Sequence, residues 1–385
     1  MLNFDFHNPT RILFGKGRIA DLATTVPLAA RVLVLYGGGS VKANGVLSQV
    51  QAALKGRAVQ EFGGIEPNPS YETLMQAVEL ARRERLDFLL AVGGGSVIDG
   101  TKFVAAAVNY EGDAWDVARK WGGSIERAIP FGSVLTLPAT GSEMNSGAVV
   151  THKVKRIKQP FSSPHVFPQF SILDPTTTFT LPPRQIGNGI VDAYTHVMEQ
   201  YLTYPVNAPL QDRFAEGILL TLIEEGPKAL AESDNYDARA NLMWCATMAL
   251  NGVVGAGVPQ DWSTHMIGHE LTALYGLDHA QTLAIVLPAM MAARREAKRA
   301  KLLQYAARVW QLRDGDENAR IDGAISRTRA FFESIGVKTR LSDYGLGAQH
   351  LPAVLEQLET RRLVRLGEHA DIDLGVSRQV LEASI

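Results

Sequence analysis

Two segments of the chain carry pairs of metal-binding side chains four residues apart. Asp192 and His196 form the first pair, and His265 and His269 form the second, with His279 ten residues further on. Residues four apart in a helix lie on one face, one turn apart, so each pair can present two ligand atoms together. Carboxylate oxygen and imidazole nitrogen suit Zn²⁺, Fe²⁺, Co²⁺ or Mn²⁺. These residues are therefore candidate ligands of a divalent metal.

The spacing leaves other interpretations open. On a helical wheel of residues 184–202 the apolar side chains gather on one arc, and Asp192 and His196 lie on the opposite arc, as they would on a solvent-exposed face. Three histidines within 15 positions, out of nine in the chain, favour a site, but spacing alone leaves His265 and His269 as equal candidates. The segment is not an HExxH motif, because Met266 takes the glutamate's place, which disfavours a zinc peptidase.

Glycine-rich turns follow two of the apolar segments. Gly-Gly-Gly-Ser occurs at residues 37–40 and again at 93–96. Glycines let the backbone approach a phosphate closely, and a helix N-terminus offers unpaired N–H groups. We expect Ser96 to cap the following helix and also reach a ligand, and Asp99 to cap or to bind a nicotinamide amide. Neither turn matches the strict dinucleotide fingerprint or the P-loop, so the glycines could also form tight turns only.

The first turn bears on the choice of cofactor. Enzymes that prefer NAD usually place an acidic side chain on the adenosine ribose. Here no acid follows the apolar run, and the next charged residue is Lys42, so a 2′-phosphate would meet backbone N–H groups, the Ser40 hydroxyl and that lysine. This predicts NADP, unless an acid arrives from another loop. In the hydroxyl-rich loop at 139–149, Thr140 and Asn145 are further candidate cofactor contacts.

The elements that position these residues differ between the two halves of the chain. Apolar segments at 31–40, 86–96, 131–138 and 170–175 are predicted as buried strands, and 71–85 and 96–110 as helices. Strands that alternate with helices predict a parallel sheet in an α/β layer fold. From about Pro182 onward the segments at 184–202, 208–230, 239–257 and 280–312 all have helical patterns.

The predicted domains are an α/β dinucleotide-binding domain at 1–178, with a Rossmann-like sheet, and an all-helical metal-binding and substrate domain at 179–385. The Pro/Thr-rich connection at 174–185 marks the boundary. The opening segment FDFHNPTRILFG alternates in strand fashion and could form an edge hairpin for dimer contacts.

Composition excludes several classes of protein. The net charge of −2 over 385 residues provides no basic field for nucleic acid. No uninterrupted apolar run reaches about 18 residues, so no membrane span is predicted. The single cysteine, Cys245, excludes an internal disulfide, fits a reducing compartment such as the cytoplasm, and is interpreted as a buried structural thiol.

Several longer motifs make the chain similar to a known family. They are RILFGKG, FGGIEPNPSYET, LLAVGGGSVIDGTKF, ATGSE and ILDP, followed by the histidine segment, and they run nearly from end to end. With them the chain resembles the iron-containing (group III) alcohol dehydrogenases, especially the butanol dehydrogenase branch and its NADPH-dependent aldehyde reductases. It departs from many members in having Pro-Ala-Thr-Gly-Ser-Glu for Gly-Thr-Gly-Ser-Glu, and Asp-His-Ala for Pro-His-Gly around His279.

The resemblance assigns roles to individual residues. It implies metal ligation by Asp192, His196, His265 and His279, and it places His269 in the substrate pocket, where His269 or a water that it holds could protonate the product. The implied cofactor contacts are Gly38, Ser40, Asn68, Gly94, Gly95, Ser96, Asp99 and Lys158, with Thr136, Leu137 and Thr140 in the matching loop.

The implied enzyme has the two-domain, dehydroquinate synthase-like architecture, with the active site between the domains. It reduces short-chain aldehydes to primary alcohols with NADPH, reversibly, using one divalent metal, Zn or Fe, as a Lewis acid; a homodimer is expected. The alternatives are a dehydroquinate-synthase-like lyase and glycerol dehydrogenase-like polyol oxidation with NAD. The lyase would need more Lys and Arg than segment 259–288 contains. A non-redox metallohydrolase or a ligand-binding module is a further alternative, in which the glycine turns are only structural.

Overall fold

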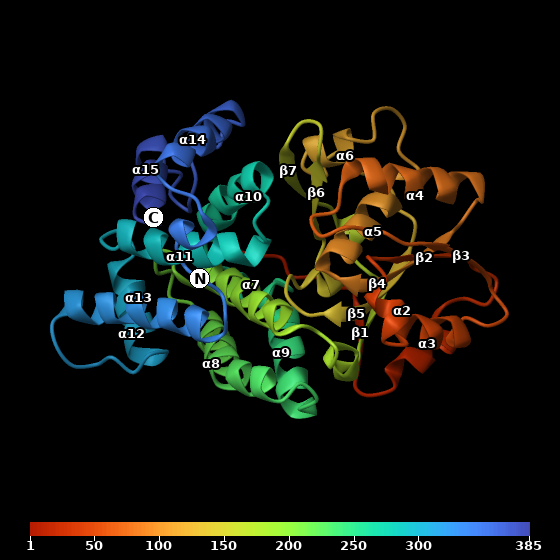
Figure 1. Ribbon diagram of the computed structural model, residues 1–385, viewed down its shortest axis with the longest axis horizontal. Coiled ribbons are helices and arrows are strands. Elements are labelled where there is room, and N and C mark those ends of the chain that lie inside the picture. The colour runs from red at the N-terminus through yellow and green to blue at the C-terminus, as the bar shows by residue number, and fades with distance from the viewer. The chain divides into compact units, whose positions relative to one another are not determined.

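The computed structural model describes residues 1–385, which divide into two compact units. The sheet unit comprises His7–Leu181 and Ser233–Met243; the helical unit comprises Met1–Phe6, Pro182–Glu232 and Trp244–Ile385. The predicted domain boundary at 178/179 stays a prediction; the first long segment of the sheet unit ends at Leu181. Element labels follow Figure 1.

The sheet unit is built on six parallel strands in the order β1-β8-β5-β4-β2-β3. The strands are β1 (Arg11–Phe14), β2 (Arg31–Tyr36), β3 (Ala58–Phe62), β4 (Phe88–Gly94), β5 (Phe131–Leu137) and β8 (Phe170–Leu173). A separate antiparallel pair comprises β6 (Gly147–His152) and β7 (Ile157–Ser162). The four predicted strands and the parallel pairing are confirmed, whereas β3 and the β6–β7 pair were not predicted.

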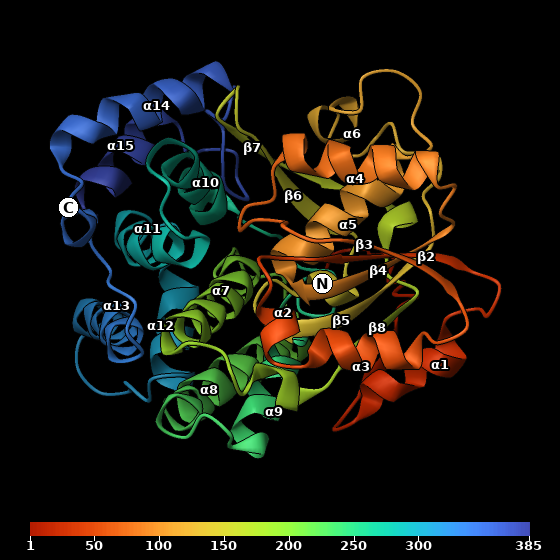
Figure 2. The ribbon, with the colours of Figure 1, turned by 45° about the vertical axis from the view of Figure 1, so that its right-hand side comes forward.

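Both faces of this sheet are buried. Leu33 and Leu35 of β2 point into one apolar core, with residues of α4 and α5, and Val32 and Val34 point into another, with residues of α3. Figure 2 shows these helices on opposite sides of the strands. The helices of this unit are α1 (Leu22–Thr25), α2 (Ser40–Ala43), α3 (Val46–Ala53), α4 (Tyr71–Arg83), α5 (Gly95–Ala107) and α6 (Asp116–Arg119). Continuous apolar runs are what a parallel sheet covered on both faces requires.

The helical unit contains the long helices predicted after Pro182. They are α7 (Pro183–Tyr201), α8 (Pro209–Ala231), α9 (Tyr236–Ala249, shared with the sheet unit), α10 (Ser263–Tyr275), α11 (His279–Ala293), α12 (Arg299–Arg308), α13 (Glu317–Ser334), α14 (Leu351–Thr360) and α15 (Leu374–Glu382). One apolar core joins α10, α11, α14 and α15. The α/β plus all-helical fold class is thus confirmed. No helix has the length and apolarity that crossing a membrane demands.

The start of the chain does not form the expected hairpin. β1 begins at Arg11 and pairs in parallel with β8, whereas a hairpin needs an antiparallel neighbour. The preceding Met1–Phe6 belongs to the helical unit, where the N–H of Leu2 donates to the carbonyl of Gly257 at 2.9 Å. The hairpin prediction is therefore wrong, whereas the strand-like pattern is confirmed at Arg11–Phe14, which form an edge strand of the sheet.

Candidate metal and cofactor sites

Three helices of the helical unit supply the candidate metal ligands. α7 carries Asp192 and His196, α10 carries His265 and His269, and His279 is the first residue of α11. The N-terminus of α11 is fixed by a hydrogen bond of 2.9 Å from the N–H of Asp278 to the side chain of Gln281. Segments about 70 residues apart in the sequence thus meet at one place.

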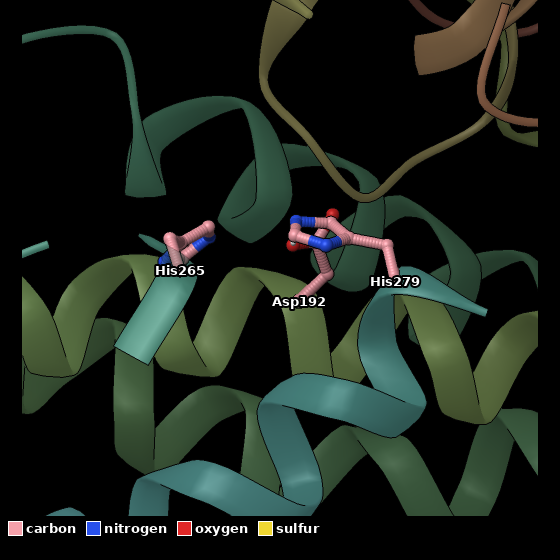
Figure 3. Close-up of side chains that lie close together, drawn as sticks. All are labelled: Asp192, His265 and His279. Carbon is pink, nitrogen blue, oxygen red and sulfur yellow. Dashed lines mark ion pairs between the residues drawn. The ribbon is translucent and has the colours of Figure 1, made fainter. Parts of the chain in front are cut away.

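The ligand atoms of Asp192, His265 and His279 all lie within 4.8 Å of one another. Figure 3 shows the imidazole of His279 over the carboxylate of Asp192, with Nε2 3.7 Å from Oδ1, and His265 beside them on α10. The Nδ1 of His196 lies 3.6 Å from the same Asp192 oxygen, and its ring stacks on that of His265 with centroids 4.7 Å apart. His196 thus lies against the compact group rather than within it.

This face of α7 is buried, so its interpretation as a solvent-exposed surface is wrong. Asp192 is 3% exposed and His196 is 5% exposed. α11 packs against α7, and His265 of α10 stacks on His196, so polar partners from later helices cover the polar arc. A helical wheel cannot distinguish such a face from a hydrated one, because both are polar.

The surroundings favour neutral imidazole at His196. Burial, followed by the charge of the neighbouring His265, holds the pKa of His196 well below its usual range. A neutral imidazole keeps the lone pair that metal binding requires. His269 lies at the edge of the same cluster, with its ring centroid 5.1 Å from that of His279 and 6.2 Å from that of His265. The structure therefore brings all five residues together.

One buried atom tests whether these residues fit a metal. The Nε2 of His265 is buried and has no hydrogen-bond partner, while its Nδ1 contacts Glu199. A buried polar atom without a partner is unfavourable, and a metal ion at Nε2 would use its lone pair. One carboxylate with imidazoles is also a donor set that Zn²⁺ and Fe²⁺ accept. The residues present therefore fit a divalent metal.

Three predicted cofactor residues meet in the sheet unit. Lys158 of β7 donates from Nζ to Oδ1 of Asn68 at 2.9 Å, and the N–H of Asn68 donates to the hydroxyl of Ser96 at 3.3 Å. Asn68 has φ 55°, in the left-handed region that asparagine tolerates. The Ser96 side chain thus binds this loop and does not cap α5, whose N-cap residue is Gly94. The capping prediction for Ser96 is wrong.

Asp99 is also used differently from the expected cap. It is 8% exposed, and its carboxylate accepts hydrogen bonds from the Ser142 hydroxyl at 2.6 Å and from the N–H of Val149 at 2.9 Å. It therefore ties α5 to the segment after β5. Asn145 has a similar role, since it donates to the carbonyl of Gly141 at 2.8 Å and accepts from Lys102 at 3.0 Å.

The two glycine turns follow the neighbouring strands β2 and β4, so they lie side by side at one edge of the sheet. A Cβ on Gly95 would lie 2.4 Å from the Thr140 hydroxyl, and one on Gly94 would lie 2.9 Å from Leu137. Glycine is thus needed at positions 94 and 95 at least partly because the neighbouring side chains leave no room for a Cβ. Gly38, by contrast, has open space where a Cβ would stand. Beyond these turns, Ser40 begins α2 and Thr136 is nearly buried in β5.

Near the first turn, Lys42 lies over the ring of Tyr36, with Nζ 4.9 Å from the centroid. The fold also brings one acid into this region from the next strand. Glu61 of β3 accepts from Gln51 at 2.7 Å and from the Tyr36 hydroxyl at 3.4 Å. The ammonium group of Lys42 and the carboxylate of Glu61, which already accepts two hydrogen bonds, therefore both lie near the end of β2.

Sequence reasoning missed two buried charged residues. Lys102 is fully buried in α5 and donates to the carbonyl of Gly147 at 2.7 Å. Its signal was a lysine three residues after Asp99 in an otherwise apolar helix. Glu199 is 3% exposed and contacts His265. It lies three residues after His196, one further turn along the same face of the helix as Asp192 and His196.

Models of known protein families match long segments of both units. Residues 9–175 match the family model "Iron-containing alcohol dehydrogenase", and residues 187–362 match "Fe-containing alcohol dehydrogenase family, C-terminal". The chain belongs to the iron-containing alcohol dehydrogenases. The resemblance inferred from the motifs is confirmed, and the chain is an enzyme of this family.

Full-length relatives support the assignment. The chain is 63% identical over 386 residues to the NADPH-dependent aldehyde reductase YqhD of Escherichia coli (strain K12), covering 100% of both chains. The crystal structure of that Escherichia coli protein superposes with a TM-score of 0.99, covering 100% of this chain and 99% of the other. A probable NADH-dependent butanol dehydrogenase of Bacillus subtilis (strain 168) is 42% identical over 93% of each chain.

Proposed function

We propose that this chain reduces short-chain aldehydes to primary alcohols with NADPH, reversibly, at one divalent metal ion. The observation that carries this proposal is the compact group of buried Asp192 and His265 with half-buried His279, and with His196 and His269 against it. The chain is 63% identical over its full length to a relative named as an NADPH-dependent aldehyde reductase, and this supports NADPH as the cofactor and aldehydes as the substrates.

In this proposal Asp192, His196, His265 and His279 hold the metal. When bound, the metal supplies Lewis acidity toward a carbonyl oxygen, and NADPH supplies the reducing equivalents. One carboxylate and neutral imidazoles leave a divalent ion with a net positive charge, which favours polarisation of a carbonyl. The donor set suits both Zn²⁺ and Fe²⁺, and we propose one of these as the native metal.

His269 is the proposed proton donor. It is 3% exposed and lies beside His279 without belonging to the compact group of ligand atoms. A positioned histidine contributes about 10²- to 10⁴-fold to proton transfer in enzymes. Its imidazole, or a water that it holds, would give the product oxygen its proton.

The sheet unit would bind NADPH along its two glycine turns. The proposed contacts are Gly38, Ser40, Asn68, Gly94, Gly95, Ser96, Asp99, Thr136, Leu137, Thr140, Asn145 and Lys158. Support comes from the N-terminus of α5, where the N-cap residue Gly94 provides no side-chain cap, because the N–H groups at the start of a helix commonly bind phosphate. Asp99 and Asn145 would act through the loop that they hold, because their polar atoms already bind protein groups.

The test is metal analysis of the purified protein together with consumption of NADPH and NADH by a series of short aldehydes. We expect one Zn²⁺ or Fe²⁺ per chain and faster turnover with NADPH than with NADH. A fluorescence titration in which neither nucleotide binds would refute the proposal. The dehydroquinate-synthase-like and glycerol dehydrogenase-like alternatives are not favoured, because the full-length relatives are named as reductases and butanol dehydrogenases.

We also propose a homodimer in the cytoplasm. Exposed apolar side chains support the dimer: Leu2, Phe4 and Phe6 near the N-terminus, and Leu210 and Phe214 one turn apart on α8. The single buried thiol of Cys245 supports a reducing compartment. Light scattering of the eluted protein gives the mass, and a monomer at micromolar concentration would contradict the dimer.

A further inference from the structure

Glu199 lies on α7 one turn beyond His196, and it contacts α10 at three points. Its Oε1 accepts from the N–H of Thr264 at 2.6 Å, and its Oε2 accepts from the N–H of His265 at 3.3 Å. The same Oε2 contacts Nδ1 of the His265 imidazole. Glu199 therefore joins the helix of two proposed metal ligands to the backbone and side chain of a third.

The two backbone contacts cap α10. The N-cap residue is Trp262, whose φ of 64° is unusual for a bulky side chain and which provides no side-chain cap. The first N–H groups of a helix need acceptors, and Glu199 provides one for each of the second and third positions. The first N–H, that of Ser263, donates to Asp261 at 2.9 Å. Capping alone would therefore explain a hydrogen-bond acceptor at position 199.

The contact with the imidazole goes beyond capping. An ionised carboxylate only accepts hydrogen bonds, so with Glu199 ionised the proton lies on Nδ1 of the neutral His265 ring, and Nε2 keeps a free lone pair. That Nε2 is the buried atom without a hydrogen-bond partner, and His265 belongs to the compact group with Asp192 and His279. In metal sites a carboxylate on the second ring nitrogen fixes the tautomer and raises the basicity of the ligand.

The burial of Glu199 points the same way. It is 3% exposed, and its only ion-pair partner is His265. Buried Glu270 on α10, by comparison, pairs with Arg361. Buried charges in proteins are normally paired or act on a metal site, because an unpaired charge is strongly unfavourable there. A divalent ion on the far side of the His265 ring would balance this carboxylate through the imidazole.

We propose that Glu199 is a positioning residue for the metal: it holds the His265 ring with the proton on Nδ1, so that Nε2 faces the metal. The inference rests on the proposed metal site. Replacing a carboxylate that binds a ligand histidine typically weakens metal binding by about 10- to 100-fold. Glutamine at position 199 can still accept from a backbone N–H, but its amide cannot satisfy both α10 and the Nδ1–H of His265 as two carboxylate oxygens do.

The experiment measures the affinity for Zn²⁺ by competition with a chelator, and the visible absorption spectrum of the Co²⁺-loaded protein. We compare the wild type, Glu199→Gln, Glu199→Asp and His265→Ala. The matched control is Glu216→Gln, because Glu216 of α8 is also buried and contacts α7 through the Tyr201 hydroxyl, but it contacts no proposed ligand.

We expect Glu199→Gln to weaken Zn²⁺ binding by about 10- to 100-fold and to change the Co²⁺ spectrum. Glu199→Asp, which keeps the acceptor chemistry, should retain part of the affinity. Glu216→Gln should lower only the melting temperature. Wild-type affinity and an unchanged spectrum in Glu199→Gln, with a lower melting temperature, would reduce Glu199 to a helix cap and overturn the inference.

A second measurement needs no variant of Glu199. Long-range ¹H–¹⁵N spectra of the Zn²⁺-loaded wild type, labelled with ¹⁵N-histidine, report which nitrogen of His265 carries the proton. Protonation at Nδ1 is expected, and protonation at Nε2 would overturn the inference. If His265→Ala instead keeps its Zn²⁺ at wild-type affinity, the proposed metal site itself fails, so the two failures are distinguishable.

Discussion

The hydroxyl of Ser142 donates a hydrogen bond of 2.6 Å to the carboxylate of Asp99 and thereby ties the helix after the second glycine turn to the segment after β5. The same carboxylate accepts the N–H of Val149 at 2.9 Å. Buried Lys102 and Glu143 lie in the same network, and their opposite charges act on each other. The helix that follows the candidate phosphate-binding turn at 93–96 is therefore held in place partly by the buried charged residues Asp99, Lys102 and Glu143.

Replacing Asp99 with asparagine should destabilise the sheet unit. The substitution keeps the shape but removes the charge that opposes buried Lys102, and breaking a buried pair in this way costs about 3 to 5 kcal/mol. Urea unfolding followed by tryptophan fluorescence measures the loss, and an NADPH titration should show weaker binding. Ser142→Ala, which removes one hydrogen bond, should cost only about 1 to 3 kcal/mol. Equal stability of Asp99→Asn and the wild type would contradict the buried-charge account.

Lys102 should make stability depend on pH in the alkaline range. Burial lowers the pKa of Lys102 from 10.5 to about 8. Between these values the unfolded chain binds more protons than the folded protein, so the free energy of unfolding should rise with pH across that window, by up to about 3 kcal/mol. Urea unfolding at several pH values should show this rise in the wild type and not in Lys102→Met. If the free energy of unfolding changes with pH in the same way in both proteins, the pKa of Lys102 is not lowered.

Gly38→Ala should separate ligand binding from packing. No atom lies within 4 Å of a Cβ built at Gly38, so the substitution should leave the melting temperature unchanged. If the backbone there approaches a cofactor phosphate, however, the added methyl group should weaken NADPH binding, as a fluorescence titration would show. Unchanged affinity would remove Gly38 from the proposed cofactor contacts.

Gly95→Ala should behave differently, because a Cβ there would lie 2.4 Å from the Thr140 hydroxyl. We expect a loss of about 1 to 3 kcal/mol in the free energy of unfolding, as for an overpacked core. The double variant Gly95→Ala with Thr140→Ser should recover part of the loss, since serine lacks the methyl group 2.5 Å from that Cβ. No recovery would mean that the strain lies elsewhere.

The histidine variants should separate metal binding from proton transfer. His265→Ala and His279→Ala should lose metal and activity together. His269→Ala should keep one metal ion per chain while kcat falls by about 10²- to 10⁴-fold. Elemental analysis beside steady-state kinetics measures both quantities. Loss of metal from His269→Ala would indicate that His269 is itself a metal ligand. The assignment of His265 rather than His269 as a ligand would then be contradicted.

The sheet was predictable because its central strands, such as Arg31–Tyr36 and Phe88–Gly94, are nearly continuous apolar runs that lead into glycine turns. The β6–β7 pair was not, because its strands mix buried residues with exposed or half-buried polar ones and Pro160 lies within β7. Short antiparallel strands of that kind acquire their register from tertiary contacts, which sequence periodicity does not contain.

The ligand cluster was only partly predictable for a related reason. The four-residue spacing of Asp192 and His196 gave their common direction, but the partners that bury them come from α10 and α11 much later in the chain. Spacing also placed His265 and His269 on one face without ranking them. The role of Glu199 depends on the backbone at Thr264, which no local pattern links to position 199.

The chain passes between its two units four times, at residues 6/7, 181/182, 232/233 and 243/244. Both Met1 and Ile385 consequently belong to the helical unit, and the sheet unit is inserted into it as two segments, His7–Leu181 and Ser233–Met243. A single proteolytic cut cannot yield two separate units, so isolating one of them requires joining segments that are distant in the sequence. Since each unit needs residues from distant parts of the chain, neither can be completed during synthesis before Met243 has emerged, and topologies with such distant contacts fold slowly.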